Sequence, residues 1–212
     1  MDISFINSLT ARLSNPLPGI DAQALLAPTH HRKYLEVHDR HNIACVLLLL
    51  FPKNDEWNIC YIQRSSKNPD DRHAGQISFP GGKYEEEDLS LEACALRETY
   101  EEIGISPDKI DILGQLSDLY VYVSRFRVFP FVGFMKDANI FRIQESEVSS
   151  IIEVPVAHLN HHGNFKKGTI EVRDFVRDNI PYYDLYGKKL WGATAMITSE
   201  FLQLCREIKV PL

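Results

Sequence analysis

The sequence of 212 residues has few of the features that mark secreted, membrane or disulfide-stapled proteins. Its four cysteines are far apart and form no C-x-x-C pair. Each lies in an apolar stretch, so we expect buried free thiols rather than metal ligands or disulfides. The N-terminal segment "MDISFINSLTARLSNPLPG" lacks the basic start and long apolar run of a signal peptide. The most apolar run, "VLLLLF", is too short to cross a bilayer and fits a doubly buried strand. These absences predict a cytoplasmic protein without membrane contact.

The sequence also lacks an excess of basic residues, since its formal net charge is −6 at pH 7. A protein that mainly binds the backbone of a nucleic acid needs a basic surface, so we expect no nucleic-acid partner. A small polyanionic substrate stays compatible with this charge, because a bound cation can reverse the local sign.

The hydrophobic content of 44% and the charged content of 25% are those of an ordinary globular domain. We expect residues 1–30 to form an N-terminal helical arm, with a helix at about 3–13, that packs on a single domain at 31–212. Strands and helices alternate without repeats, which predicts an α/β fold with a central mixed sheet covered by helices. Strands are expected at 42–51, 57–65, 76–82, 111–116, 127–135, 148–154, 169–175 and 182–186, with helices at 90–103 and 194–207.

The segment "RETYEEIG" (97–104) places three acids close together on the helix expected at 90–103. At about 100° per residue, Glu98, Glu101 and Glu102 share one helix face. Gly104 is the expected C-terminal stop of this helix. The opposite face is expected to be the core stripe, with Ala93, Leu96, Tyr100 and Ile103.

A solvated acidic face is the plain interpretation of such a run, but neighbouring residues argue for a cation site. Leu91, Cys94 and Ala95 lie one turn earlier on the acidic side, so this side is expected to be packed as well. Packed carboxylates need a compensating cation, and acids near a helix C-terminus oppose the helix dipole. Arg97 precedes Glu101 by four residues and can orient its carboxylate by a charge-assisted hydrogen bond.

The "FPGGK" segment (79–83) places a Pro-Gly-Gly break at a strand end shortly before this helix. Glycines allow a close approach of the backbone, so a carbonyl at Gly81 or Gly82 could complete a metal shell. Oxygen ligands alone suit Mg²⁺ or Mn²⁺, and no His/Cys cluster accompanies the acids, which argues against zinc.

The stretch "GGKYEEEDLSLEACALRETYEEIGI" (81–105) resembles the Nudix box, which reads G-x5-E-x7-R-E-U-x-E-E-x-G-U with U a bulky aliphatic residue. It departs from that pattern in three places: Asp88 replaces the first glutamate, one extra residue precedes Arg97, and Thr99 stands at an aliphatic position. The Asp and the extra residue resemble the coenzyme A pyrophosphatase branch of Nudix hydrolases.

That branch also carries the upstream pattern R-[SA]-x3-R-x3-G-x3-F-P-G-G. The second half matches from Gly75 through "FPGG", whereas Arg64-Ser65 and Arg72 are out of register with the first half. The segments "LWGATA" (190–195) and "ESEVSSIIEVPV" (145–156) also look like this branch.

The resemblance implies a Nudix α/β/α sandwich that hydrolyses a diphosphate linkage in a nucleoside diphosphate derivative. In this branch coenzyme A or acyl-coenzyme A is cut to 3′,5′-ADP and (acyl-)4′-phosphopantetheine. ADP-ribose, a dinucleotide or a nucleoside triphosphate is the alternative substrate. A non-catalytic Nudix ligand sensor is the alternative of another class, although all three acids are kept here. The implied partner is a small nucleotide-containing molecule, and homodimers are common in this fold.

The resemblance also assigns roles to individual residues. Glu98, Glu101 and Glu102, with the carbonyl of Gly81, are the expected ligands of Mg²⁺ or Mn²⁺. Arg97 is expected to orient the acids, and Glu147 is the favoured general base, with Glu145 as the alternative. Glu101 is also assigned a catalytic role. The expected substrate-binding residues are Arg64, Arg72, Lys83 and Gly82, because arginine pairs well with phosphate and glycine allows close approach.

Overall fold

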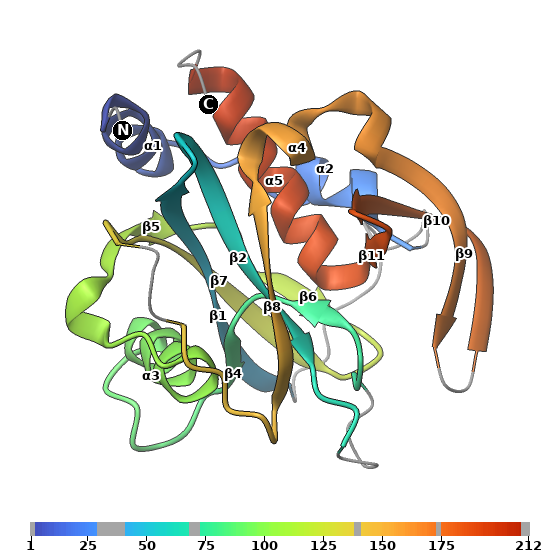
Figure 1. Ribbon diagram of the computed structural model, residues 1–212, viewed down its shortest axis with the longest axis horizontal. Helices are drawn as coiled ribbons and strands as arrows, with labels where there is room; N and C mark the ends of the chain where they lie inside the picture. Colours follow the sequence, from blue (N-terminus) through green and yellow to red (C-terminus); the bar gives the residue numbers. More distant parts are fainter. Residues whose placement is uncertain (1–2, 29–40, 68–72, 138–140, 173–174, 209–212) are drawn as a thin grey trace.

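The computed structural model describes residues 3–28, 41–67, 73–137, 141–172 and 175–208. Its strands form a large mixed sheet and a smaller antiparallel one (Figure 1). The large sheet contains β1 (Asn42–Lys53), β2 (Glu56–Arg64), β3 (Ile77–Ser78), β4 (Gly81–Lys83), β5 (Asp111–Gln115), β6 (Leu119–Val121), β7 (Phe126–Phe134) and β8 (Val148–Pro155). The small sheet contains β9 (Phe165–Val172), β10 (Phe175–Leu185) and β11 (Lys188–Leu190).

In the large sheet the order is β3-β2-β1-β7-β5, while β4 pairs with β1, β6 with β7 and β8 with β2. Strands β1 and β7 run parallel, and the remaining pairs are antiparallel. The short β4 therefore lies beside the first half of β1, where Cys45 stands opposite Gly82. This pairing fixes the position of the glycine pair in the sheet.

Helices cover both faces of the large sheet (Figure 1). They are α1 (Ser4–Leu13), α2 (Ile20–Gln23), α3 (Leu91–Ile103), α4 (Val156–Asn160) and α5 (Gly192–Ile208), with short 3₁₀ turns at η1 (Ala24–Leu26), η3 (Pro107–Lys109) and η4 (His162–Asn164). Helix α3 packs on one side, and α1, α4 and α5 lie on the other. The expected α/β/α sandwich with a central mixed sheet is confirmed.

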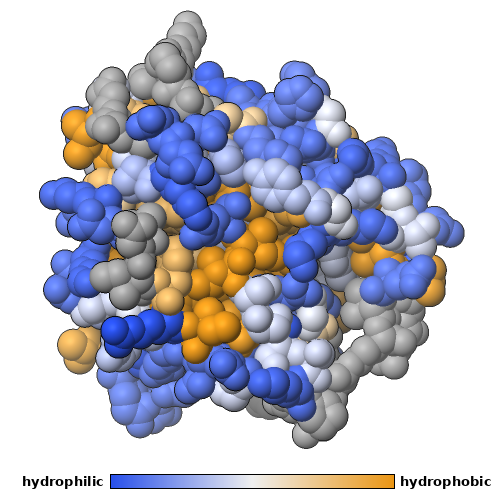
Figure 2. All heavy atoms as spheres, in the orientation of Figure 1, coloured by the Kyte–Doolittle hydropathy of each residue, from blue (hydrophilic) through white to orange (hydrophobic). Residues whose placement is uncertain are grey.

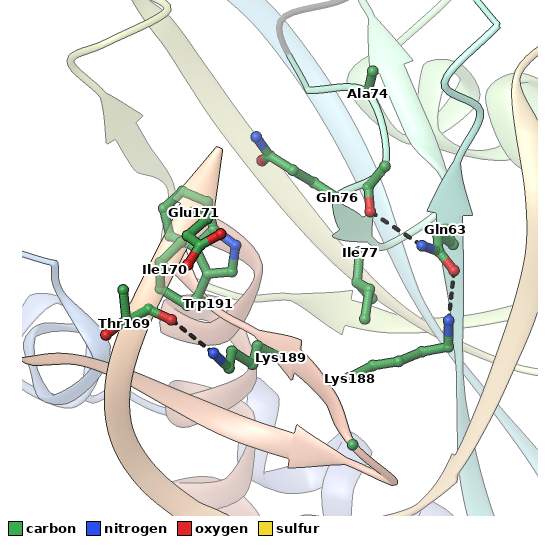
Figure 3. Close-up of a pocket in the computed structure, with 12 residues that line it drawn as sticks. Gln63, Ala74, Gln76, Ile77, Thr169, Ile170, Glu171, Lys188, Lys189 and Trp191 are labelled. Carbon is green, nitrogen blue, oxygen red and sulfur yellow. Dashed lines mark hydrogen bonds between the residues drawn. The ribbon is translucent and has the colours of Figure 1, made fainter. Parts of the chain in front are cut away.

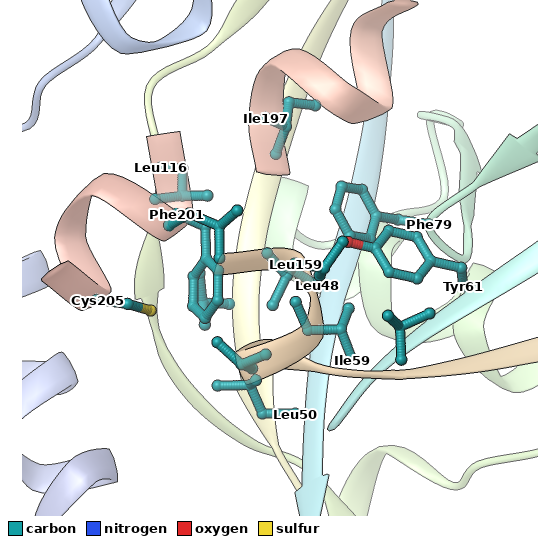
Figure 4. Close-up of a cluster of buried hydrophobic side chains, with 14 of the residues drawn as sticks. Leu48, Leu50, Ile59, Tyr61, Phe79, Leu116, Leu159, Ile197, Phe201 and Cys205 are labelled. Atoms are coloured by element: carbon teal, nitrogen blue, oxygen red, sulfur yellow. The ribbon is translucent and has the colours of Figure 1, made fainter. Parts of the chain in front are cut away.

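Strand β1 divides the interior into two cores because its side chains alternate between the faces of the sheet. Leu48 and Leu50 belong to the core under α5, whereas Leu47 and Leu49 belong to the core under α3. All four are fully buried, so the apolar run is the doubly buried strand that the sequence predicts. Figure 4 shows the α5 side, where the Tyr61 and Phe79 rings stack with centroids 5.0 Å apart.

Both ends of α3 carry the expected stop signals. The Ser90 side chain accepts a hydrogen bond of 3.0 Å from the Ala93 N–H, which satisfies one free donor of the first turn. Gly104 adopts a left-handed conformation with φ of 73°, and its N–H donates to the Tyr100 carbonyl. Local sequence therefore fixes the length of the helix that carries the acids.

The core stripe predicted for α3 is wrong in part. Tyr100, expected inside, is 55% exposed, and Thr99, about 100° away around the helix, is fully buried. Helix α3 packs against β1 and β4. The glycines of β4 allow a close approach, so the buried face is rotated towards Glu102. The buried Thr99 hydroxyl donates to the Ala95 carbonyl at 2.7 Å and thus carries no unpaired donor.

The N-terminal helix contributes to the main core. Helix α1 packs against α5 and β5. Phe5 and Leu9 are buried there, and the Phe5 ring lies 5.9 Å from the Trp57 ring between centroids. The expected boundary at residue 30 lies outside the described residues.

The small sheet differs from the prediction in extent. Strands were expected at 169–175 and 182–186, but β9 begins at Phe165 and β10 runs from Phe175 to Leu185 with an irregularity between Arg177 and Ile180. Strands β6 and β11 were not expected, because three residues are too few to show an alternating pattern.

The four cysteines are free and buried, which confirms that prediction. Among the helices that the structure describes, none combines the length and the apolar character needed to span a bilayer. Figure 2 shows a face of the molecule that is mainly hydrophilic at its edges, with an apolar area near its centre.

Candidate metal and substrate site

Two acids of α3 lie against the glycine pair of β4. The Glu98 side chain is 14% exposed and the Glu102 side chain only 2% exposed. The Gly81 N–H donates to Glu102 Oε2 at 2.9 Å. A Cβ atom on Gly82 would lie 2.4 Å from Glu98 Oε2, so only glycine leaves room for this carboxylate. The geometry brings together the glycine pair and two of the three predicted acids.

Burial is the main reason why the pKa of Glu102 is raised to about 8. The hydrogen bond from Gly81 and the charge of Arg64, whose Nη1 lies 3.7 Å from Glu102 Oε1, oppose this shift. The negative charges of Glu98 and Glu147 add to it. Burial also raises the pKa of Glu98, and Arg97 opposes that rise. Glu102 is therefore buried and Glu98 partly buried in surroundings that disfavour their anionic forms.

Arg97 connects four side chains and one carbonyl around these acids. Its Nε and Nη2 bind the two oxygens of Asp88 at 2.8 and 3.0 Å in a bidentate pair. Its Nη1 donates to Glu98 at 3.0 Å and to Glu101 at 3.1 Å, so the expected contact with Glu101 is present. Its Nη2 also contacts the Lys83 carbonyl and the Cys94 sulfur. The guanidinium therefore fixes the side of α3 that faces β4.

Asp88 is the residue of this network to which sequence reasoning gave no role. Its side chain is 4% exposed, and the hydrogen bonds from Arg97 are the main cause that lowers its pKa to about 2. The Glu85 N–H also donates to Asp88 at 2.9 Å. The signal was available in the sequence, because Asp88 occupies a box position where a carboxylate is expected.

Glu101 lies differently from the other two acids. Its side chain is 53% exposed and its carboxylate pairs with Arg97. Within the described ranges, no group of three or more His, Cys, Asp or Glu side chains is arranged to hold a metal ion. The structure therefore places two predicted acids in a shared buried setting and the third at its rim.

The loop before β8 is fastened to the end of α3. The Arg142 N–H donates to the Ile103 carbonyl at 2.8 Å, and the Gln144 N–H donates to the Glu102 carbonyl at 2.9 Å. The Ser65 N–H donates to the Glu147 carbonyl at 2.7 Å. The exposed Glu147 carboxylate contributes to the raised pKa of both Glu98 and Glu102, so it lies within electrostatic reach of them.

The other predicted site residues do not all lie beside Glu98 and Glu102. Glu145 is 80% exposed and points to Lys67, with 3.9 Å between the charged atoms. Arg64 extends from the end of β2 to Glu102. The Lys83 side chain is exposed, while its carbonyl accepts from Arg97. Arg72 lies outside the described residues.

The donor set fits a hard divalent cation at Glu98 and Glu102. Carboxylate oxygens are the ligands that Mg²⁺ and Mn²⁺ prefer, and the remaining positions are commonly filled by water and substrate phosphate. Burial raises the pKa of Glu102, and a cation bound beside this carboxylate would favour its anionic form. The carbonyls of the adjacent glycine pair stay a predicted addition to this set.

Helix α3 places Glu98 and Glu102 against the Gly81–Gly82 strand and ends at Gly104, in the order of the box pattern that the sequence resembles. The NUDIX domain model matches residues 40–178, which is more than half of the chain. The chain belongs to the Nudix domain family.

The chain is similar to proteins named "uncharacterized Nudix hydrolase NudL" from Escherichia coli O1:K1 and from Shigella boydii serotype 18. Each is 37% identical over 130 residues, which covers 61% of this chain and 66% of the relative, just under two thirds of its length.

Solved structures agree in fold. RenU, a Nudix hydrolase from M. smegmatis, gives a TM-score of 0.53 at 11% identity and covers 82% of this chain and 89% of that one. The MutT protein from Methanosarcina mazei Go1 gives 0.52 at 19% identity and covers 82% of this chain and all of that one. At these identities the likeness concerns the fold alone.

Proposed function

We propose that this protein is a metal-dependent hydrolase of a diphosphate linkage in a nucleoside diphosphate derivative, with coenzyme A or acyl-coenzyme A as its substrate. The products would be 3′,5′-ADP and (acyl-)4′-phosphopantetheine. The observation that carries the chemistry is the carboxylate pair of the partly buried Glu98 and the buried Glu102, held against the Gly81–Gly82 backbone. Family membership supports the same reaction class.

The choice of coenzyme A rests on the sequence. The "G-x3-FPGG" pattern from Gly75, the extra residue before Arg97 and the Asp at position 88 resemble the coenzyme A pyrophosphatase branch. In the structure the Asp88 carboxylate forms a bidentate pair with Arg97. ADP-ribose, a dinucleotide and a nucleoside triphosphate are the competing substrates.

Glu98 and Glu102, with Gly81, would hold Mg²⁺ or Mn²⁺, and Glu101 at the rim is the predicted third acid. When bound, the cation neutralises phosphate charge and lowers the pKa of a water molecule. Arg97 keeps Glu98 and Glu101 in place through its Nη1 atom.

The remaining groups act on water and substrate. The Glu147 carboxylate would accept the proton of the attacking water, from a loop that is pinned to both α3 and the end of β2. Arg64, 3.7 Å from Glu102, would pair with a phosphate oxygen. Lys83, Arg72 and Gly82 stay predicted substrate contacts, and the space beside the Gly82 Cα is taken by the Glu98 carboxylate.

The test is a substrate panel of coenzyme A, ADP-ribose, NADH and nucleoside triphosphates with Mg²⁺ or Mn²⁺, with products identified by mass spectrometry. Formation of 3′,5′-ADP from coenzyme A at the highest kcat/KM is expected. Turnover of another panel member without 3′,5′-ADP formation would show that coenzyme A is not the substrate. A lack of turnover of every member would overturn the reaction class and favour a ligand sensor.

A further inference from the structure

A groove separate from the α3 acids lies between the end of the large sheet and the small sheet. It has a volume of about 620 Å³ and is lined on one side by the β2–β3 region and on the other by β9, β11 and Trp191 (Figure 3). Gln63 lines it, whereas the next residue, Arg64, reaches Glu102. Because successive strand residues point to opposite faces, the groove and the acids lie on opposite sides of β2.

Lys188 crosses this groove from β11 to β2. Its Nζ donates to Gln63 Oε1 at 2.7 Å, although the lysine itself is exposed. The Gln63 amide is oriented in turn, because its Nε2 donates to the Gly75 carbonyl at 3.3 Å. An ammonium has three donors, and this bond uses one of them. Lys188 is thus a cation held in position at the groove with donors left for a ligand.

A second cation and an aromatic ring complete the lining. Lys189 Nζ donates to the Thr169 carbonyl at 2.7 Å on the wall formed by β9, and it lies 5.6 Å from the Tyr182 ring centroid. The partly buried Trp191 also lines the groove (Figure 3). Two lysines against one glutamate, Glu171, give the lining a net positive charge in a chain whose net charge is −6. The side chains that line the groove therefore fit a ligand in which an anionic group is joined to a flat or apolar one.

Backbone hydrogen bonds connect this groove to the α3 site. The Gly75 N–H donates to the Arg64 carbonyl at 3.1 Å, and the Arg64 N–H donates to the Gln76 carbonyl at 2.9 Å. Gly75 and Gln76 line the groove, while Arg64 extends towards Glu102. A substrate that contacts both places has to pass around the end of β2, where these backbone bonds lie.

We propose that this groove binds a phosphate of the substrate that lies outside the scissile diphosphate, with Lys188 and Lys189 as the specificity-determining residues and Trp191 against the adjoining nucleoside. The proposal rests on the proposed function for its substrate. It assigns recognition to the small sheet, away from the acids that act on the diphosphate. The ribose 3′-phosphate of coenzyme A has the required chemistry.

The kinetic test compares coenzyme A with dephospho-coenzyme A, which differs only in lacking that phosphate. In the double variant K188A/K189A, the ratio of kcat/KM for coenzyme A to kcat/KM for dephospho-coenzyme A should fall about tenfold or more, as for the loss of a charge-assisted contact. The matched control is Lys167→Ala, an exposed lysine of β9 outside the groove, which should leave the ratio unchanged. An unchanged ratio in the double variant, or an equal fall in the control, would overturn the proposal.

A binding test separates this proposal from the proposed function. Adenosine 3′,5′-bisphosphate, adenosine 5′-monophosphate and inorganic phosphate are titrated by calorimetry into protein with EDTA, so no turnover is involved. The bisphosphate should bind most tightly, and K188A/K189A should reduce its affinity about tenfold to that of the monophosphate. Equal affinity for the bisphosphate and inorganic phosphate, or unaltered binding in the variant, would overturn the groove assignment even if hydrolysis is observed. Preferential binding without hydrolysis would support the groove while contradicting the proposed function.

Discussion

Two buried glutamates of this protein, Glu200 of α5 and Glu102 of α3, have opposite surroundings. Glu200 is fully buried and accepts hydrogen bonds from the Gly19 N–H, the Ser117 N–H and the Gln23 side chain, at 3.1, 3.3 and 2.8 Å. Glu102 accepts one hydrogen bond, from Gly81, and lies beside other acids that help to raise its pKa.

We infer from this difference that Glu200 is a structural carboxylate, whereas Glu102 is the one proposed to hold a metal ion. The donors around Glu200 come from the N-terminal segment and the β5–β6 connection, so this side chain fastens three parts of the fold together. Glu102 also joins α3 to β4 and to the end of β2, but only through the hydrogen bond from Gly81 and the 3.7 Å ion pair with Arg64, so its carboxylate has more capacity left for a ligand. The comparison predicts that the two residues respond to the same substitution in opposite ways.

The largest effect is expected for Glu102→Gln. Loss of the anionic ligand should reduce kcat/KM with Mg²⁺ by at least about a hundredfold, since even loss of an outer partner of a metal ligand lowers activity 10–100-fold. The amide keeps the shape and can accept from Gly81, so the melting temperature should change by no more than about 3 °C. Steady-state kinetics and calorimetry measure both. Activity near that of the unmodified protein would refute the role of Glu102.

The matched substitution Glu200→Gln should do the reverse. One oxygen becomes an NH₂ group that faces a donor, which costs about 2 kcal/mol of unfolding free energy and lowers the melting temperature by about 4–8 °C. At 20 °C, kcat/KM should stay within about twofold. A stable variant with impaired turnover would reverse the comparison and place the functional carboxylate in α5.

A smaller effect is expected for Asp88→Asn, which removes the charge that holds Arg97. We expect kcat/KM to fall about tenfold through misplaced acids, and Asp88→Glu should recover part of this loss. The folded-state pKa of Asp88 is about 2, below the ordinary 3.8. The pair therefore stabilises the fold above pH 3.8, and that contribution is lost as the pH falls through 2.

Acid unfolding should consequently show this contribution in the unmodified protein and not in the Asn variant. The control is Asp118→Asn, which breaks the exposed pair between Asp118 and Arg127 on the β6–β7 hairpin. Equal kinetic losses in the two variants would mean that Asp88 has no special link to the site.

The smallest effect is expected for Gly82→Ala. The new methyl group would overlap the Glu98 carboxylate, which must then move. It can do so at low cost because it is the flexible end of a side chain. Activity should drop by about three- to tenfold, while unfolding free energy changes by less than about 1 kcal/mol. Denaturant unfolding and kinetics on the same preparation distinguish this from general destabilisation. A large stability loss with normal activity per folded molecule would contradict the close approach.

Local sequence was sufficient for much of the fold near the site. The ends of α3 follow from Ser90 and Gly104, and the buried strand β1 follows from its apolar run. The rotation of α3 could not be predicted, because it depends on how closely β4 approaches, which is a tertiary contact. This contact decides that Glu102 is buried and Glu101 is exposed.

Contacts were predicted where residues carry a dense local pattern and missed where single residues meet over long sequence distances. Glu98, Glu102 and the glycine pair come together as the pattern indicates. Nothing in the local sequence around Glu200 indicates its bonds to residues more than 80 positions away. The groove lined by Lys188 was also missed, since it forms only when the small sheet packs beside β3.

The most direct measurement of the central claim is Mn²⁺ binding, followed by electron paramagnetic resonance, to the unmodified protein, Glu102→Gln and Glu200→Gln in parallel. The account predicts that the α3 variant binds Mn²⁺ at least about tenfold more weakly, whereas the α5 variant binds like the unmodified protein. Equal Mn²⁺ affinity in all three proteins would contradict the assignment of Glu102 to the metal.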